Sequence, residues 1–475
     1  MRQAQLAAKT ALHALALSLG LGAAACSTDN EAHSPQPVPP QLAGVGVGVV
    51  HRLSVLGEAS ASLAAFERTK STYEIATGVS VEIVRRDHAG ILADLQGETA
   101  PATYDLLIVP SHMLGALVEK AYVQPIDVFL KDPSSYDPRL FDSEKDVPPG
   151  WWSQVSWYRG RPYGYPFQLR PMSLWYREDL FEDEDESLAF EKQFGRPLAF
   201  PRDASELEQV AAFFHRPQEG LYGTVIAGRS RSLASEWLMY AAMFGARILD
   251  TSTSDAYGDI LVNSPQAVRA TEFFVSLLRF SPPEARRYDA VDAVRAFESR
   301  HIAVGMMRHD LAFAGPEPNR ERRIGGIGYA PPPIQPDILT PVEGDTFLIA
   351  RTARAREAFG FMQWALSQDA QVVQTVNGGL AARPSTFTDS RVTALPRTYP
   401  SLPSMQILMF PRLVMPSVTM LTPKVAEADR LLEAMQSELT RIVAGEETPK
   451  AGLDRIAVRM GHILQGKAKL RYRPN

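Results

Sequence analysis

The sequence predicts an α/β fold with largely parallel sheets, arranged as two lobes. At 475 residues the chain exceeds the size of one ordinary compact domain. From Val50 onward, strand-like and helix-like segments alternate, which is typical of strand–helix–strand units. The apolar run from Leu106 to Val109 is of the kind that is buried on both faces of a parallel sheet.

The N-terminus has the three-part layout of a secretory signal. Arg2 and Lys9 precede the apolar run Ala11 to Leu21, and small residues then lead to Cys26, the single cysteine of the chain. The apolar run is short for a bilayer-spanning helix. We therefore predict a cleaved signal peptide over residues 1–25 and lipidation of Cys26 after export. The alternative is an ordinary small-residue cleavage site, since Ala23 stands where lipoprotein signals usually carry Leu.

Residues 26–48 predict a lipoprotein tether. The segment is polar, holds four prolines and a Gly-Val-Gly-Val-Gly run, and lacks a helical apolar period. The protein is thus expected to be exported and membrane-anchored, in the periplasm or at the cell surface.

The globular part opens with elements that favour a ligand site at one sheet edge. A strand over 52–56, a helix that carries Leu63 and Phe66 and ends at Gly78, and a strand over 79–83 are predicted. Ser111 follows the buried strand 106–109 and is expected to cap the next helix. Ligands of open α/β sheets lie beyond the carboxyl ends of the strands, which places Ser111 near such a ligand.

The second half continues the alternation after an aromatic-rich block. Four of the six tryptophans lie between residues 151 and 181. Strands are predicted at 302–306 and 347–349, and a last helix is expected to start at Thr448 as N-cap with Pro449 in its first turn. The periodicity predicts further helices over 207–214, 233–244, 267–278, 291–297, 354–366 and 424–443.

The sequence carries no motif of a catalytic or cofactor site. Its nine histidines lack metal-ligand spacing, and no HExxH, CxxC or Gly-x-Ser-x-Gly element occurs. Gly461 to Lys467 resembles a phosphate loop, but Ala468 lacks the hydroxyl required on magnesium. A net charge of -5 without a basic stripe excludes a nucleic-acid partner. We expect no enzyme, no cofactor and no metal.

The order of several segments resembles the extracellular solute-binding proteins of family 1, the carbohydrate-binding group that includes maltose-binding proteins. The resemblance covers about residues 50–464. The segments that carry it are Phe66 to Val84, Tyr104 to Asp127, Gly160 to Phe181, Asn263 to Pro265, Phe297 to Asp310, Gly344 to Ala350 and Gly378 to Arg383.

This resemblance implies a two-lobed periplasmic binding protein fold of type II, with a ligand cleft between lobes that are joined by several crossings. Residues 49–167 and 302–345 are expected in lobe 1, and residues 168–301 and 346–475 in lobe 2. The implied function is capture of a small ligand, a sugar or oligosaccharide, by lobe closure and its delivery to the membrane subunits of an ABC importer. We expect a monomer.

A sugar site requires flat aromatic platforms and planar polar groups. The platforms expected are Trp151, Trp152, Tyr163, Tyr165 and Trp237, and the polar ligand-binding residues expected are Ser111, Gln168, Arg170, Glu236, Asp310, Asp345 and Arg383. Each aromatic residue has core packing as its competing explanation. For Glu58, a surface ion pair is favoured.

Two departures from the family pattern leave the ligand class open. Gly57-Glu58 and Asp345 stand where many sugar-binding members have an aromatic residue, and Arg170 could favour a ligand with a carboxylate. Two other functions also stay open. The protein could present its ligand to a membrane sensor, or it could be an exported polysaccharide lyase or glycosidase, which two carboxylates facing each other across the cleft would support.

Overall fold

The computed structural model describes residues 52–96, 103–250, 257–313, 326–334, 340–394 and 418–474. These residues belong to one compact unit that spans residues 40–475. The predicted signal peptide, Cys26 and the tether lie outside the described residues. Within the described ranges, the helices are too short or too polar to cross a membrane.

A mixed sheet runs through the whole unit. Its strand order is β10-β6-β11-β3-β1-β2, with β12 beside β11 and β9 beside β6. The strands are β1 (Arg52–Glu58), β2 (Ser80–Arg86), β3 (Leu106–Pro110), β6 (Gly164–Arg177), β9 (Val304–Arg308), β10 (Ile327–Ala330), β11 (Thr340–Ile349) and β12 (Val418–Met420). β1 pairs in parallel with β2 and β3. β11 runs antiparallel to β3 and β6, and β6 also runs antiparallel to β9 and β10. The prediction of largely parallel sheets is therefore correct for β1, β2 and β3 and wrong for β6 and β11.

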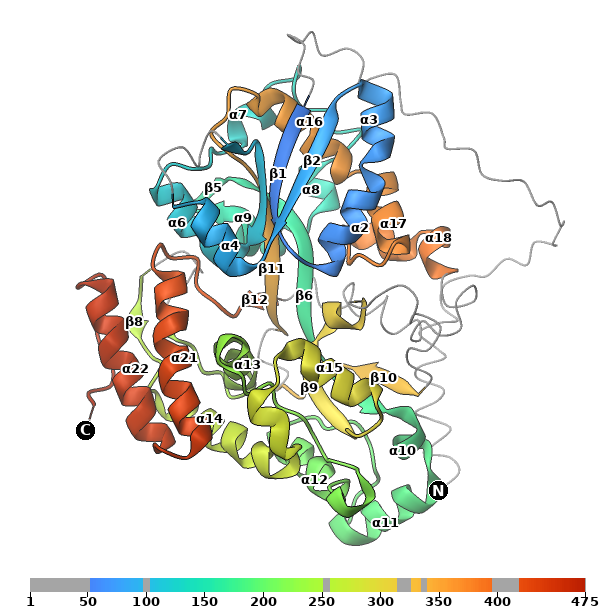
Figure 1. Ribbon diagram of the computed structural model, residues 1–475, viewed down its shortest axis with the longest axis vertical. Helices are drawn as coiled ribbons and strands as arrows, with labels where there is room; N and C mark the ends of the chain where they lie inside the picture. The colour runs from blue at the N-terminus through green and yellow to red at the C-terminus, as the bar shows by residue number, and fades with distance from the viewer. Residues whose placement is uncertain are drawn as a thin grey trace, which may run out of the picture. The chain divides into compact units, whose positions relative to one another are not determined.

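The long strand β6 connects two hydrophobic cores. Its first half pairs with β11 from Gly164 to Pro171, and its second half pairs with β9 and β10 from Met172 to Arg177. Figure 1 shows β6 and β11 running from the helices around β1 toward those around β9. We call the body around β1–β3 the first lobe and the body around β9 the second lobe.

The first lobe packs helices against β1, β2, β3 and β11. Phe66 lies at the centre of an aromatic cluster and meets Phe167, Phe347 and Phe361 at ring-centroid distances of 5.4 to 6.0 Å. Its helices are α2 (Ala61–Thr69), α3 (Ser71–Thr77), α4 (His88–Asp94), α6 (Leu114–Glu119), α7 (Asp127–Leu130), α8 (Ser143–Asp146), α9 (Pro149–Ser156), α16 (Ala355–Ala365), α17 (Gln368–Val376) and α18 (Ser390–Thr393). Short strands β4 (Trp157–Tyr158) and β5 (Arg161–Pro162) form a separate hairpin.

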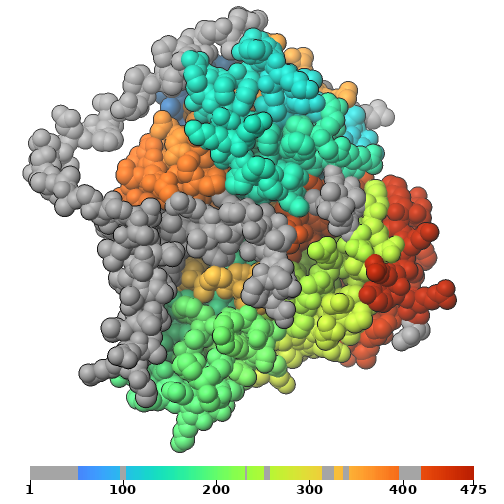
Figure 2. All heavy atoms as spheres, turned by 180° about the vertical axis from the view of Figure 1, so that it is seen from behind, coloured from blue at the N-terminus to red at the C-terminus, as the bar shows by residue number. Residues whose placement is uncertain are grey.

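The second lobe is mainly helical. Trp237 and Phe274 are buried in its core together with Leu431 and Leu453 from the C-terminal helices. Figure 2 shows these C-terminal helices (red) beside the segment that contains α14 (yellow-green). The helices are α10 (Glu178–Glu182), α11 (Glu184–Phe194), α12 (Ala204–Phe213), α13 (Ser230–Met243), α14 (Pro265–Leu277), α15 (Ala290–Glu298), α21 (Ala428–Ala444) and α22 (Pro449–Leu464), with β7 (Leu249–Asp250) and β8 (Asp259–Ile260) as a small hairpin.

The packing corrects the predicted lobe boundaries in two places. β9 and β10 pair with the second half of β6, and Val304 lies in the second core, although residues 302–345 were expected in lobe 1. Residues 347–370 supply part of the first core, although residues 346–475 were expected in lobe 2. The reason is that β11 crosses back along β6, so the chain returns to the first lobe at Phe347 and leaves it again through β12.

Most predicted elements are confirmed, with a local difference at one helix start. Thr448 caps α22 by accepting a hydrogen bond from the Ala451 amide, and Gly78 ends α3 in the left-handed conformation at φ 73°. Ser111 does not cap a helix, because the chain forms a short 3-10 turn, Ser111–Met113, before α6 begins. Ser111 itself is buried at the end of β3.

A close backbone contact joins α6 of the first lobe to the segment that leads into α21. A Cβ added at Gly115 would lie 2.1 Å from the carbonyl oxygen of Lys424. We expect Gly115→Ala to lower the free energy of unfolding by about 1–3 kcal/mol, because the segment must move away. Gly360→Ala in α16 is the matched control, because nothing lies within 4 Å of its added Cβ. The control should stabilise by about 0.5–1 kcal/mol in urea unfolding, and an equal loss in both variants would contradict the contact.

Candidate functional site

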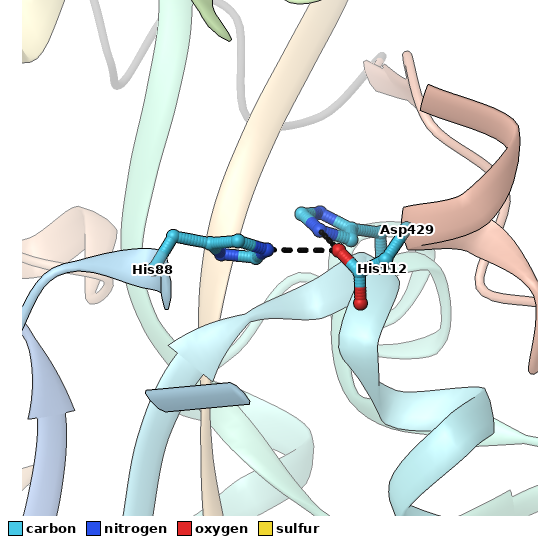
Figure 3. Close-up of side chains that lie close together, drawn as sticks. All are labelled: His88, His112 and Asp429. Atoms are coloured by element: carbon cyan, nitrogen blue, oxygen red, sulfur yellow. Dashed lines mark hydrogen bonds and ion pairs between the residues drawn. The ribbon is translucent and has the colours of Figure 1, made fainter. Parts of the chain in front are cut away.

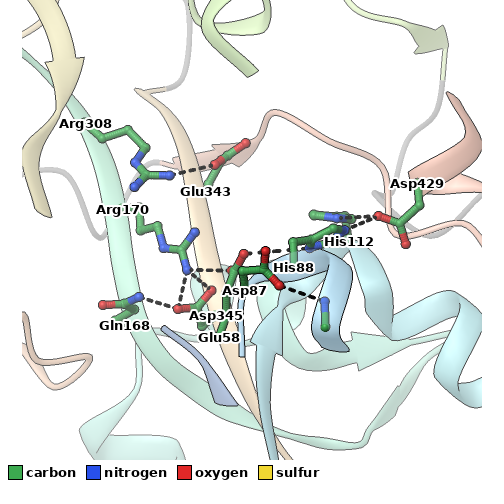
Figure 4. Close-up of polar contacts among 11 residues, drawn as sticks. Glu58, Asp87, His88, His112, Gln168, Arg170, Arg308, Glu343, Asp345 and Asp429 are labelled. Carbon is green, nitrogen blue, oxygen red and sulfur yellow. Dashed lines mark hydrogen bonds and ion pairs between the residues drawn. The ribbon is translucent and has the colours of Figure 1, made fainter. Parts of the chain in front are cut away.

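Four polar side chains from three strands meet where the two lobes join. Glu58 ends β1, Gln168 and Arg170 lie in the middle of β6, and Asp345 lies in β11 opposite both Gln168 and Pro110. Figure 4 shows these residues converging from their strands. We call Glu58, Gln168, Arg170 and Asp345 the junction cluster.

Arg170 is the hub of the junction cluster. Its Nη2 lies 2.5 and 2.6 Å from the two carboxylate oxygens of Asp345 and donates a longer hydrogen bond of 3.3 Å to Glu58 Oε2. Gln168 Nε2 donates to the same Asp345 carboxylate. Arg170 and Asp345 are only 7% and 1% exposed, so the pair is shielded from solvent screening.

The electrostatics of the cluster follow from burial and pairing. Burial raises the pKa of Asp345 in spite of the opposing charge of Arg170, so this carboxylate depends on the guanidinium to stay ionised. Burial alone would lower the pKa of Arg170, but the charges of Asp345 and Glu58 raise it. Burial would likewise raise the pKa of Glu58, yet the charges of Arg170 and His88 hold it below its usual value. The positive charge of Arg170 is thus already matched within the protein.

Two buried polar atoms of the cluster make no hydrogen bond to the described residues. They are Gln168 Oε1, an acceptor, and Arg170 Nε, a donor. A buried polar atom without a partner costs about 1–3 kcal/mol, which an incoming hydrogen-bonding group would recover. The cluster therefore offers one acceptor and one donor beside a charge-compensated pair.

The second lobe brings a further charged group to the same place. Arg308 at the end of β9 lies 3.9 Å from Glu343 Oε2 of β11, and its Nη2 donates to Asp310 Oδ2 at 3.3 Å. The charge of Asp310 also acts on Arg170. Acidic and basic groups of both lobes thus meet along β6 and β11 (Figure 4).

Next to the junction cluster, one carboxylate bridges two histidines. His88 Nε2 and His112 Nε2 lie 2.8 and 3.1 Å from the same oxygen, Asp429 Oδ1 (Figure 3). Burial opposes the charge of His112, but the hydrogen bond to Asp429 raises the His112 pKa. Glu58 connects the two groups, since its Oε1 lies 3.7 Å from His88 Nδ1. Glu58 is therefore not the surface ion pair that the sequence favoured.

Glu236 on α13 is a buried carboxyl whose negative charge is stabilised by few hydrogen bonds or positive charges. Its Oε1 accepts one long hydrogen bond of 3.5 Å from the Ala227 amide, and this bond and the charge of Arg308 oppose the effect of burial on the Glu236 pKa. Burial raises the Glu236 pKa to about 8. This carboxyl lies in the second lobe, and among the described residues it makes no hydrogen bond or ion pair to the junction cluster.

Four of the five predicted aromatic platforms, Trp151, Trp152, Tyr165 and Trp237, are buried in hydrophobic cores, and the last three bond their polar atoms there. Trp152 stacks on Tyr165 at 5.1 Å and 21°, and its Nε1 donates to the Gly164 carbonyl. The Tyr165 hydroxyl bonds to Ser143 inside the first core, and Trp237 Nε1 donates to Thr271 inside the second. Their polar atoms are satisfied internally, as is usual for buried aromatic residues.

The other predicted residues divide between the junction and more distant places. Trp151 belongs to an apolar cluster with residues of both lobes, such as Trp175 and Leu380, and its Nε1 makes no hydrogen bond to the described residues. Ser111 directly follows Pro110, which faces Asp345. Tyr163 is half-buried against the core around β3. Arg383 pairs instead with Asp146 of the first lobe at 2.7 Å.

The sequence predicts Gln168, Arg170 and Asp345 as ligand-binding residues, and the structure brings these three together, whereas His88, His112, Asp429 and Arg308 were not predicted. A signal existed for the histidines, since His88 follows β2 and His112 follows β3 at the edge where ligands bind in such sheets. No signal existed for Asp429, which is 317 positions from His112. Two surface hollows, one beside Tyr288 and one beside Lys450, lie elsewhere on the second lobe.

Comparisons with known proteins agree with this architecture. A family model described as bacterial extracellular solute-binding protein matches residues 58–372. A solute-binding protein of Agrobacterium radiobacter K84 in complex with ribitol is 22% identical, with a TM-score of 0.69 over 86% of this chain and 97% of that chain.

Two further solved structures are similar over the same span. A maltose-bound protein of T. maritima is 19% identical, with a TM-score of 0.67 over 87% of this chain and 100% of that one. A substrate-binding protein of Listeria monocytogenes in complex with cycloalternan is 15% identical, with a TM-score of 0.67 over 88% and 100%. These likenesses establish the two-lobed α/β fold. A search of curated protein sequences gave no significant match.

Proposed function

Because the chain belongs to the bacterial extracellular solute-binding protein family, we propose that it captures a neutral polyol or sugar at the junction cluster and delivers it to an ABC importer. The pairing of Arg170 with Asp345 and Glu58 is the observation that favours a neutral ligand. A ligand carboxylate would have to displace one of these protein carboxylates from a buried ion pair. A neutral ligand leaves the pair intact.

The two unbonded atoms of the cluster suit hydroxyl groups. A hydroxyl donates one hydrogen bond and accepts others, so adjacent hydroxyls of a polyol can bond both Gln168 Oε1 and Arg170 Nε. Trp151, whose Nε1 is also unbonded, offers an apolar ring with a polar edge. Several structural neighbours were solved with neutral ligands of this kind, namely ribitol, maltose and D-mannitol.

Capture requires the lobes to separate and close. The atoms offered to the ligand are buried in the present arrangement, so a ligand reaches them only when the lobes open along β6 and β11. A ligand that touches both lobes stabilises the closed form by its differential affinity. The importer would then recognise the closed form. Presentation of the ligand to a membrane sensor uses the same closure and remains the second candidate.

The junction cluster does not favour a glycosidase or lyase. Glu58 and Asp345 share one guanidinium instead of facing each other across a gap that could hold a glycosidic bond. The family of the chain is one of binding proteins. We therefore propose that the protein releases its ligand unchanged.

A thermal-shift panel tests the ligand class. The mature protein, starting after the predicted tether, is unfolded and refolded to remove retained ligand and is then heated with neutral polyols, neutral mono- and oligosaccharides, and sugar acids. We expect one or more neutral compounds at about 100 times their Kd to stabilise the folded state by about 2.7 kcal/mol, seen as a higher Tm. A rise with sugar acids alone would contradict the neutral class, and no rise with any compound would contradict the proposed function.

We also propose that the protein is anchored through Cys26, as the sequence predicts. Expressed in a bacterial host with its native leader, the wild type should partition with membranes and carry a diacylglyceryl mass at its N-terminus. Cys26→Ser should appear in the soluble exported fraction, with unchanged ligand binding. An unmodified wild-type mass, with the leader cleaved, would show an ordinary secretory signal instead.

A further inference from the structure

The proposed function leaves one cluster of metal-ligating side chains unused, the triad of His88, His112 and Asp429. His88 begins α4 and His112 lies in the turn after β3, so both come from the first lobe. Asp429 lies in the first turn of α21, a helix whose apolar face packs in the core of the second lobe. The triad thus joins the two lobes next to the candidate ligand site.

We propose that the triad binds one divalent transition-metal ion, zinc in the first place. Two imidazoles and a carboxylate are a common three-ligand set for zinc, with a water in the fourth position. The three ligand atoms lie within 4.8 Å of one another, and those of His88 and His112 lie 2.8 and 3.1 Å from Asp429 Oδ1. A tetrahedral zinc site places its ligand atoms about 3.3 Å apart, given metal–ligand lengths near 2.0 Å. A small outward shift of Asp429 therefore makes room for the ion.

A carboxylate behind the triad completes the arrangement. Glu58 Oε1 lies 3.7 Å from His88 Nδ1, the ring nitrogen that does not face Asp429 (Figure 4). Metal-bound histidines usually present their second ring nitrogen to such a carboxylate, which orients the ring and strengthens the ligand. Glu58 also touches Arg170, so the metal site and the junction cluster share one residue.

The triad is accessible and has a favourable charge. The side chains of His88, His112 and Asp429 are 20%, 14% and 25% exposed, which leaves a path for an ion and for a water ligand. The carboxylates of Glu58 and Glu343 also act on His112. Because Glu58 is shared with Arg170 and Glu343 with Arg308, Asp429 supplies the main negative charge for zinc, and the ion would tie α21 to the first lobe.

Isothermal titration with ZnCl₂ and with CoCl₂ tests the proposal on the mature protein after removal of metals with EDTA. We expect one ion per chain, and visible d–d absorption bands for the cobalt form that report nitrogen and oxygen ligands in a low-coordinate site. His88→Ala/His112→Ala should abolish this binding, and Asp429→Asn should weaken it at least about 10-fold. His462→Ala, a substitution of an exposed histidine in α22, is the matched control and should bind like the wild type.

Two results would overturn the metal site. One is the absence of stoichiometric zinc and cobalt binding by the wild type, and the other is equal binding by the wild type and the triad variants. Circular dichroism in EDTA shows whether each variant is folded. If the double variant does not fold, Asp429→Asn and the cobalt spectrum of the wild type decide. Ligand binding is measured separately in EDTA, so failure of the metal site leaves the solute-capture proposal standing.

Discussion

Arg170→Met is expected to lower the free energy of unfolding by about 3–5 kcal/mol near neutral pH, because it leaves a buried carboxylate without its counter-charge. Asp345 is 1% exposed, and its main charge partner is the Arg170 guanidinium. Urea unfolding measures the loss. The loss should shrink as the pH falls, because burial already raises the pKa of Asp345 and the variant can protonate this carboxyl before it unfolds.

Two companion variants separate the buried pair from a general effect of losing an arginine. Arg139→Met removes an exposed pair with Asp137 and should cost less than about 1 kcal/mol. Arg170→Met/Asp345→Asn removes both charges and should recover much of the loss of the single variant. If the single and double variants were equally unstable, the Arg170–Asp345 pair would not be the cause.

Glu236→Gln is expected to stabilise the protein in alkaline solution and to have little effect in acid. The Glu236 pKa of about 8 in the folded state lies above its usual value of 4.5, so the folded state binds this proton more tightly than the unfolded state does. The contribution of the Glu236 carboxyl to wild-type stability is therefore fully present below about pH 4.5 and decreases by about 1.4 kcal/mol per pH unit until the pH passes about 8. Glutamine removes this dependence.

Urea unfolding at about pH 5 and about pH 9 measures the difference, which should reach a few kcal/mol in favour of the variant at the higher value. Glu272→Gln is the matched control, because Glu272 is exposed on α14 of the same lobe. It should leave the pH profile unchanged. If the free energy of unfolding of Glu236→Gln changed with pH in parallel with that of the wild type, the Glu236 carboxyl would ionise in the folded state without destabilising it.

The fold was largely predictable because its signals are local. The apolar run of β3, the αL glycine after α3 and the Thr448 cap of α22 each act within a few residues and appear as the sequence indicates. The lobe boundaries were not predictable in the same way. They depend on which half of β6 each later strand pairs with, and no local pattern encodes this pairing.

The site was predictable only in part, for a related reason. Gln168 and Arg170 stand out because they interrupt an apolar crossing, and Asp345 does so in β11. The presence of an aromatic side chain did not distinguish ligand-binding residues from core residues, since the indole nitrogens of Trp152 and Trp237 make their hydrogen bonds inside the cores. The triad of His88, His112 and Asp429 forms only when three segments far apart in the sequence come together, and the spacing of these residues does not predict that contact.

Ligand capture at the junction cluster is tested by isothermal titration of the wild type and Gln168→Met with a neutral ligand found in the panel. We expect saturable one-to-one binding by the wild type and about 10-fold weaker binding by the variant, because a lost buried hydrogen bond is worth about 1–1.5 kcal/mol. Gln124→Met, at a first-lobe glutamine that bonds the Ala350 carbonyl, should bind like the wild type. Equal affinity in Gln168→Met and the wild type would contradict ligand capture at the junction cluster.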